Sequence, residues 1–186
     1  MINRKQFLGA FLSDRHVAAV QPSSPFLIRR LLRRIDASKV MAVIELGPGD
    51  GVATLPLLKA LPADARYLAI ERNHAFCAGL AGVDPRLDAV EGDVRDLRKI
   101  AADKNMEQVD LVLASVPFTY LSKDERESVI AAAKSFLRPG GQLIVFHQYS
   151  PLMLPVLRRH FSSVKTEIEP WNLPPCFLFD CQNTAN

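Results

Sequence analysis

The hydrophobic positions of this chain follow two different periods from residue 40 onward. Short apolar runs favour buried strands, whereas segments with apolar residues three or four apart favour helices. The runs that we predict as strands are residues 40–44, 66–71, 87–91, 109–114, 143–147, 164–168 and 176–179. The segments that we predict as helices between them are residues 52–61, 73–80, 122–137 and 151–160, with Leu97 in a further helix. Strands that alternate with helices indicate an α/β fold, with a mostly parallel sheet covered on both faces.

The carboxyl-terminal part departs from this alternation. No helix is predicted between the last two strands, so they form a hairpin. A closing hairpin gives one antiparallel strand in an otherwise parallel sheet of seven strands. At 186 residues, the whole chain is predicted to be a single domain.

Helices are predicted to precede the sheet. Residues 1–20 have apolar positions with helical spacing, and Gln21–Pro25 interrupts the pattern. Ser24 is a suitable N-cap and Pro25 suits the first turn, so a second helix is predicted over residues 26–35. Its apolar side chains are predicted to face the core and its four arginines to lie opposite: Leu27, Ile28, Leu31, Leu32 and Ile35 against Arg29, Arg30, Arg33 and Arg34.

Basic charge is concentrated in these helices. The net charge is only +3, but residues 1–40 contain eight Lys or Arg and two Asp. One interpretation of residues 1–38 is a solvated helix face or a lid. The other is an interfacial surface, with Phe7, Leu8, Phe11 and Leu12 in a bilayer and the arginines against anionic headgroups.

A glycine-rich turn follows the first predicted strand. Gly47, Gly49 and Gly51 come directly after Glu45, and a helical pattern begins at Val52. A strand, a glycine turn and a helix form a nucleotide site at the carboxyl end of a first strand, because glycine allows close backbone approach. The spacing differs from that of a dinucleotide fingerprint, and the acid disfavours a phosphate. S-adenosylmethionine, which has a sulfonium and an ammonium but no phosphate, fits this turn better.

Two further acids stand at the ends of the next two strands. Glu71 ends the second strand, where a carboxylate can accept from both ribose hydroxyls. Asp93 follows the third strand, where it would accept from an adenine amino group or, alternatively, cap the helix that contains Leu97. Acids at the ends of three successive strands are more specific than the glycines alone.

These motifs resemble those of the class I S-adenosylmethionine-dependent methyltransferases, and the resemblance implies a Rossmann-like fold. Glu45-Leu46-Gly47-Pro48-Gly49 matches the first family motif, and Leu137–Gly141 matches a feature before the fifth strand. By this resemblance the residues that contact S-adenosylmethionine are Glu45, Gly47, Pro48, Gly49, Glu71, Arg72, Gly92, Asp93, Val94 and Ser115.

The acceptor side is predicted from the segment after the fourth strand. Base-modifying methyltransferases usually have Asn or Asp, then a proline and an aromatic residue there, but this chain has Ser115-Val116-Pro117-Phe118. The serine disfavours a nucleic acid substrate. The catalytic candidates are Tyr149, Ser115 and Phe118, because a hydroxyl can accept from an amine and an aromatic ring can hold a methylated ammonium. Tyr120 and Trp171 are further aromatic candidates, and core packing is the simpler interpretation of Phe118.

The chain also resembles the bacterial phospholipid N-methyltransferases that act on phosphatidylethanolamine. The most discriminating motifs are Pro22-Ser23-Ser24, Tyr149-Ser150-Pro151 and Asn172-Leu173-Pro174-Pro175. The resemblance implies N-methylation of a phospholipid amine at a membrane surface. A small-molecule amine, or less favourably an rRNA adenine, remains an alternative acceptor, and a cofactor-binding protein without catalysis is a further alternative.

Cysteines and hydropathy indicate the compartment. Cys77, Cys176 and Cys181 have no metal-binding spacing, and no apolar run approaches the roughly 18 residues of a membrane span. We therefore predict a reduced, cytoplasmic protein without a bound metal. Peripheral contact with the anionic inner membrane face is an additional expectation.

Overall fold

The computed structural model describes residues 23–148, 151–172 and 174–184. Its helices are α2 (Pro25–Leu32), α3 (Thr54–Ala60), α4 (His74–Leu80), α5 (Leu97–Asp103), α6 (Lys123–Phe136) and α7 (Leu154–His160). Its strands are β1 (Ala42–Leu46), β2 (Arg66–Glu71), β3 (Leu87–Glu91), β4 (Val109–Ala114), β5 (Leu137–Gln148), β6 (Ser163–Glu169) and β7 (Cys176–Gln182). Short 3₁₀ helices are η2 (Ala37–Lys39), η3 (Val94–Asp96) and η4 (Phe118–Tyr120).

The sheet has seven strands in the order β3-β2-β1-β4-β5-β7-β6. The pairs among β1 to β5 are parallel, whereas β7 is antiparallel to both of its neighbours. The predicted Rossmann-like sheet with one antiparallel strand is therefore confirmed. The order reverses between β1 and β4, and ligands bind at such a switch point in open α/β sheets.

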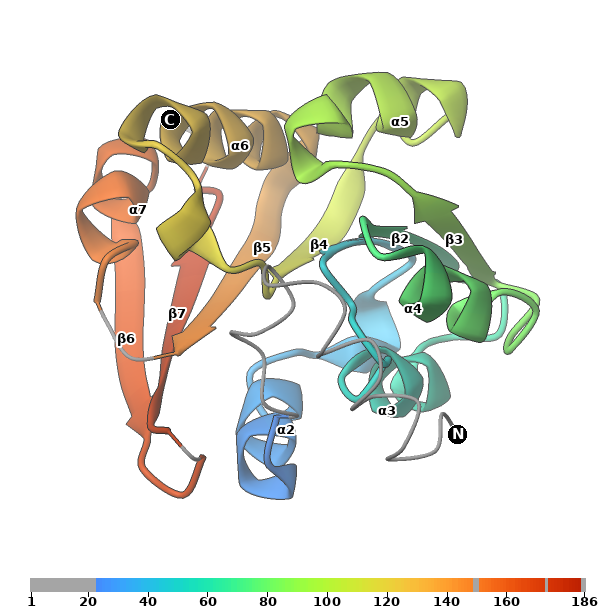
Figure 1. Cartoon of the computed structure of the whole chain (residues 1–186), viewed down its shortest axis with the longest axis horizontal. Coiled ribbons are helices and arrows are strands. Elements are labelled where there is room, and N and C mark those ends of the chain that lie inside the picture. Colours follow the sequence, from blue (N-terminus) through green and yellow to red (C-terminus); the bar gives the residue numbers. More distant parts are fainter. Residues whose placement is uncertain (1–22, 149–150, 173, 185–186) are drawn as a thin grey trace.

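Helices cover both faces of the sheet (Figure 1). The face under α5, α6 and α7 packs residues such as Ile44, Val112 and Val145 against Leu97 and Ile130. The opposite face, under α2, α3 and α4, is a second core cluster that includes Val43, Leu113, Leu27, Leu57 and Leu80. Because alternate residues of β1 point to opposite faces, Ile44 belongs to one cluster and Val43 to the other.

The helix that precedes the sheet begins where the sequence predicts. The hydroxyl of Ser24 accepts a hydrogen bond from the Leu27 amide, and Pro25 occupies the first turn. Leu27, Ile28 and Leu31 are buried, as expected from their spacing. The prediction for residues 1–20 lies outside the described residues.

One boundary prediction is wrong. The sequence predicts that Pro139-Gly140-Gly141 separates a helix from a strand that begins at Leu143, but β5 begins at Leu137. Leu137 already pairs with Val109, and the Gly140 amide donates to the carbonyl of Asn183. These partners keep the Pro-Gly-Gly segment within β5 although Gly140 has a φ of +79°, and a register shift between Val109 and Leu111 accommodates this irregularity.

Candidate functional site

The glycine turn and the end of β4 meet at the switch point of the sheet. Ser115 follows β4, and its amide donates to the Leu46 carbonyl over 2.9 Å. Its hydroxyl donates to the Gly47 carbonyl over 2.5 Å. Ser115 therefore fixes the first residue of the turn, and its oxygen retains lone pairs for a further donor.

The three glycines of the turn, Gly47, Gly49 and Gly51, all lie in the left-handed region that favours glycine. Gly47 has a φ of +74°, and an added Cβ would lie 3.0 Å from Cγ1 of Val116. Gly49 has a φ of +58°, but an added Cβ there would meet no heavy atom within 4 Å. Backbone conformation thus favours glycine at Gly47 and Gly49. No described protein atom fills the space that a side chain at Gly49 would occupy, so a ligand can approach the backbone there.

Glu45 lies beneath this turn, fully buried. Its Oε2 accepts hydrogen bonds from Thr54 Oγ1 over 2.6 Å and from the Tyr67 hydroxyl over 2.7 Å. Its Oε1 has no partner among the described residues. Burial raises the pKa of Glu45 to about 7, although the bonds from Thr54 and Tyr67 lower it. A buried acceptor without a donor is costly, so this oxygen can accept from a ligand cation.

Glu71 connects the turn to the second strand. Its Oε2 accepts from the Gly49 amide over 3.0 Å, and its Oε1 accepts from the Asn73 amide over 2.8 Å. Burial raises the pKa of Glu71, and these backbone bonds partly oppose the rise. Each oxygen retains a lone pair, so the predicted ribose contact is compatible with this arrangement.

Asp93 caps the 3₁₀ helix η3 rather than the helix that contains Leu97, because α5 begins one turn later with Asp96 at its N-cap. Its Oδ1 accepts from the Arg95 amide and from the Arg95 side chain, each over 2.9 Å. The hydrogen bond with Arg95 is the main reason that the pKa of Asp93 is lowered. Arg95 also pairs with Glu125 over 2.8 Å, which ties this loop to the start of α6.

The remaining cofactor candidates lie around the same strand ends. Gly92 donates its amide to the Glu71 carbonyl, and an added Cβ would lie 2.6 Å from Cδ1 of Ile100. Val94 is half-buried and Arg72 is exposed, while Pro48 is buried within the turn. The predicted residues thus lie on neighbouring segments that follow β1 to β4.

The donor set fits S-adenosylmethionine. The unpartnered Oε1 of Glu45 can accept from an ammonium, and the open space at Gly49 admits a ligand close to the backbone. Glu71 offers two carboxylate oxygens at the end of the adjacent strand. Among the described residues, no cluster of His, Cys, Asp or Glu could hold a metal ion.

The aromatic candidates on the acceptor side separate into three groups. Phe118 is completely buried in the core under α6, which favours packing over contact with a substrate. Tyr149 lies outside the described residues. Tyr120 and Trp171 are largely exposed, with Trp171 at 75%.

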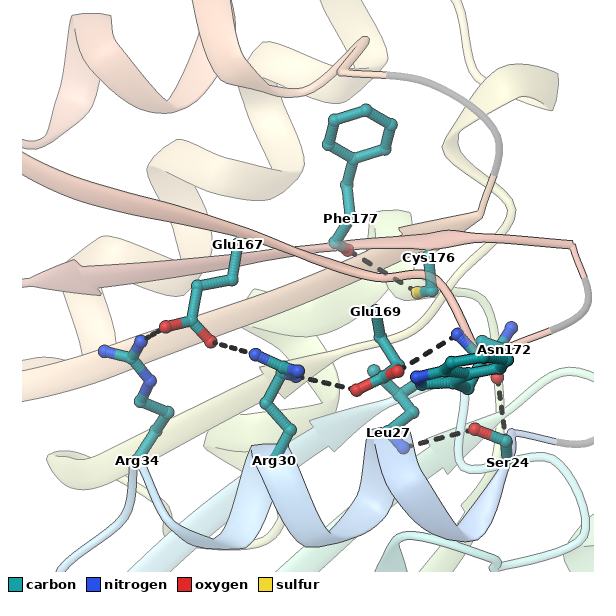
Figure 2. Close-up of polar contacts among 10 residues, drawn as sticks. Ser24, Leu27, Arg30, Arg34, Glu167, Glu169, Asn172, Cys176 and Phe177 are labelled. Atoms are coloured by element: carbon teal, nitrogen blue, oxygen red, sulfur yellow. Dashed lines mark hydrogen bonds and ion pairs between the residues drawn. The ribbon is translucent and has the colours of Figure 1, made fainter.

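Two motifs far apart in the sequence meet at the start of α2. The Ser24 amide donates to Oδ1 of Asn172 over 2.8 Å (Figure 2). The Asn172 side chain in turn donates to the Pro174 carbonyl over 2.8 Å. Asn172 is 1% exposed. Gln148, the last residue of β5, pairs with Cys176 at the same end of the sheet. The start of α2 and the segment that follows β6 therefore form one wall at the carboxyl edge of the sheet.

Ion pairs attach α2 to the hairpin of β6 and β7 (Figure 2). Arg30 bonds Glu169 over 2.7 Å and Glu167 over 3.3 Å, and Arg34 pairs with Glu167. Arg34 also lies 3.8 Å from Asp180. The sequence predicts that all four arginines lie on a face that is solvated or meets anionic headgroups, but Arg30 and Arg34 form ion pairs within the protein. Their i, i+4 spacing on a helix, and the i, i+2 spacing of the two glutamates on a strand, are the signals that could have revealed this contact.

Similarity to known proteins agrees with this geometry. The family described as a methyltransferase domain matches residues 43–141. This chain belongs to the S-adenosylmethionine-dependent methyltransferases. The ornithine lipid N-methyltransferase of Singulisphaera acidiphila is 32% identical over 180 residues, which cover 95% of this chain and 94% of that protein. The similarity to bacterial lipid N-methyltransferases inferred from the motifs is thus confirmed.

Solved structures show the same fold. The N-methyltransferase NodS from Bradyrhizobium japonicum WM9 superposes with a TM-score of 0.72 at 16% identity, over 87% of this chain and 98% of NodS. The 16S rRNA N2 G1207 methyltransferase of T. thermophilus, solved with AdoMet and guanosine, gives a TM-score of 0.66 at 22% identity, over 89% of this chain and 44% of that protein. None of the helices in the described part of this methyltransferase combines the length and the hydropathy that a membrane span requires.

Proposed function

We propose that this methyltransferase transfers methyl groups to the primary amine of a membrane lipid, with the headgroup of ornithine lipid or of phosphatidylethanolamine as acceptor. The observation that carries the proposal is the extent of the match to the lipid N-methyltransferase. The domain family covers only residues 43–141, whereas that relative is aligned over 95% of the chain. The longer alignment takes in the region of α2 and the β6–β7 hairpin, which together form the wall at the acceptor side.

The residues around the glycine turn are proposed to hold the cofactor. The backbone of Gly47 and Gly49 would contact the cofactor closely. The Glu45 carboxylate would accept a hydrogen bond from the cofactor's ammonium, and the Glu71 carboxylate would accept from its ribose hydroxyls. Asp93 and Val94 would border the adenine, beside Arg72, Gly92 and the buried Pro48. When bound, S-adenosylmethionine supplies an electrophilic methyl on a sulfonium, and the protein's work is largely alignment of the acceptor with that methyl.

The acceptor amine is proposed to approach from the end of β4. Ser115 Oγ already donates to Gly47, so toward an amine it can act only as an acceptor. Tyr149 is the proposed aromatic contact for the methylated ammonium, since such contacts contribute about 0.5–2 kcal/mol each. Phe118 is proposed to support the end of β4 from within the core rather than to touch the amine.

Reaction at the inner face of the cytoplasmic membrane is part of the proposal. Phe26 at the start of α2 and Trp171 after β6 are 55% and 75% exposed, and the bond between Ser24 and Asn172 brings their segments together. Exposed aromatic residues beside a basic helix suit the interface of an anionic bilayer.

Labelled cofactor tests the proposal. The full chain is incubated with S-adenosylmethionine labelled in its methyl group and, in separate reactions, with total bacterial lipid, total RNA and a soluble metabolite extract. We expect label in the lipid fraction, on the amine of ornithine lipid or phosphatidylethanolamine. Label only in RNA, or only in soluble amines, would contradict the proposal.

A further inference from the structure

A groove of about 570 Å³ lies between α2 and the start of α3. It is lined by Ser23, Pro25, Ile28, Arg29, Leu32, Arg33, Val52 and Pro56. Its volume falls within the range of small-molecule sites, roughly 300–1,000 Å³. Apolar side chains form most of this lining, and the only charged side chains among the lining residues are Arg29 and Arg33.

These two arginines differ from the other two on the same helix. Arg30 and Arg34 point toward β6 and are paired with glutamates (Figure 2). Arg29 lies on α2 and Arg33 is its C-cap residue. Within the described part of the chain, neither arginine has an acidic partner. One side of this helical segment therefore has its charges neutralised within the protein, and the other side presents two cations beside an apolar surface.

The groove begins beside the glycine turn and the start of α2. Val52 directly follows Gly51 of the glycine turn, and Ser23 and Pro25 flank the residue that bonds Asn172. Arg29 lies one helical turn farther along, about 6 Å from Pro25 at a rise of about 1.5 Å per residue. An anion held by Arg29 would thus be close to an amine at the carboxyl edge of the sheet.

We propose that this groove binds the lipid that carries the acceptor amine, with Arg29 on its phosphate or carboxylate and the apolar lining on the first part of its acyl chain. The inference rests on the proposed function and assigns a substrate site to it. Charge complementarity favours a lipid over the chain's own residues 1–20 as the occupant. That segment contains Arg4, Lys5 and Arg15 against one acid, Asp14, so it would bring more positive charge to Arg29 and Arg33.

Calorimetry with soluble probes tests the site without relying on turnover. The probes are dihexanoyl phosphatidylethanolamine, which carries a phosphate, and Nα-dodecanoyl ornithine, which carries a carboxylate. Arg29→Gln is expected to weaken binding of the favoured probe about tenfold, or about 1.4 kcal/mol, because the anion loses a charged hydrogen-bond donor. Arg29→Lys should restore most of the affinity. The control is Arg158→Gln, which removes an exposed arginine on α7 and should bind like the unaltered chain.

A second variant tests occupancy of the groove. Leu32→Cys places a thiol in the lining, while Cys77, Cys176 and Cys181 are buried and provide a slow background in the unaltered chain. We expect rapid reaction of the introduced thiol with a thiol reagent, and protection when the probe is added. A thiol that is protected without probe would show that the groove is already covered by the chain and would overturn the inference.

The two proposals fail in different ways. If the probe is methylated and its affinity is unchanged in Arg29→Gln, the groove is not the lipid site but the proposed function stands. If neither probe binds or is methylated by the unaltered chain, both proposals fall. Weaker binding in Arg29→Gln with an unchanged midpoint of thermal unfolding supports the site.

Discussion

Two buried glutamates have pKa values shifted in opposite directions. One lies in the cofactor half, which comprises β1 to β4 and the glycine turn, and the other lies in the acceptor half, which comprises α2, β5 and the β6–β7 hairpin. Glu45, in the cofactor half, is fully buried and bonds only neutral hydroxyl groups, and burial raises its pKa to about 7. Glu169, in the acceptor half, is 2% exposed and bonds Arg30. Burial raises the pKa of Glu169 too, but the bonds from Arg30 and the Trp171 amide outweigh it, so its pKa is lowered.

The difference shows how each half is assembled. The cofactor half relies on backbone groups and hydroxyls and leaves a carboxylate oxygen without a partner among the described residues. The acceptor half satisfies its acids internally, through the ion pairs between the α2 segment and β6. A ligand is thus expected to complete the first half, whereas the second is already held together before a ligand arrives.

The largest expected effect is on the pH dependence of stability through Glu45. The unfolded carboxyl loses its proton near pH 4.5, while the folded one keeps it until about pH 7. Folding stability should therefore fall as pH rises through this window, by on the order of 3 kcal/mol, and then level off. Glu45→Gln should abolish this fall. Urea unfolding of the unaltered protein and of the Glu45→Gln variant between pH 4.5 and 8.5 measures this fall. If the free energies of unfolding of the two proteins change with pH in the same way, the raised pKa of Glu45 is contradicted.

A hundredfold loss of cofactor affinity is the next effect, from Gly49→Ala. An added Cβ at Gly49 meets no protein atom but occupies the open side of the turn, where the cofactor is proposed to pass. Gly82→Ala is the matched control, because Gly82 also has a positive φ, +75°, with nothing within 4 Å. Both variants should lose about 1–2 kcal/mol of stability from backbone strain. Calorimetry should show weaker binding of S-adenosylhomocysteine to Gly49→Ala alone, by about 100-fold, or roughly 2.8 kcal/mol. Equal affinities would place the cofactor elsewhere.

Glu169→Gln probes the acceptor half. Removing one member of a largely buried pair should lower the free energy of unfolding by about 2 kcal/mol, below the range for fully buried pairs because Arg30 is partly exposed. The lowered pKa means that this stability is present above about pH 4.5 and is lost as pH falls below it. Chemical unfolding at pH 7 and pH 3.5 checks both points. A similar loss at the two pH values would argue against the ion pair.

The smallest effect is expected from Asn172→Ala. The change removes the acceptor for the Ser24 amide and the donor to the Pro174 carbonyl, for a loss of about 1 kcal/mol of stability. Because Asn172 lies on the acceptor side, the KM for lipid should rise while the affinity for S-adenosylhomocysteine stays unchanged. Weaker cofactor binding in this variant would show that the two halves do not work separately.

Local signals explain why much of the cofactor half could be predicted. The bounds of β2, β3 and β4 match the apolar runs, and α6 begins at a capping box formed by Ser122 and Glu125, residues only three positions apart in the sequence. These features depend on residues within a few positions of one another. The partners of Glu45 were not predicted, because Tyr67 reaches it only once β2 pairs with β1.

The acceptor half depends on distant contacts and was harder to predict. The pairing of Arg30 with Glu169 joins residues 139 positions apart and requires α2 to lie against β6. The start of β5 was misplaced because Gly140 finds its partner in Asn183, beyond β7. Motif resemblance nevertheless singled out Ser24 and Asn172, whose contact is seen only in the fold.

One competition experiment tests the central claim most directly. The full chain is given deuteriomethyl S-adenosylmethionine together with mixed vesicles of ornithine lipid and phosphatidylethanolamine, total RNA and a soluble amine extract, and the products are identified by tandem mass spectrometry. The account predicts that the deuteriomethyl group appears on the headgroup nitrogen of one of the two lipids. Its appearance on an RNA base or a soluble amine, with both lipids unlabelled, would contradict the account.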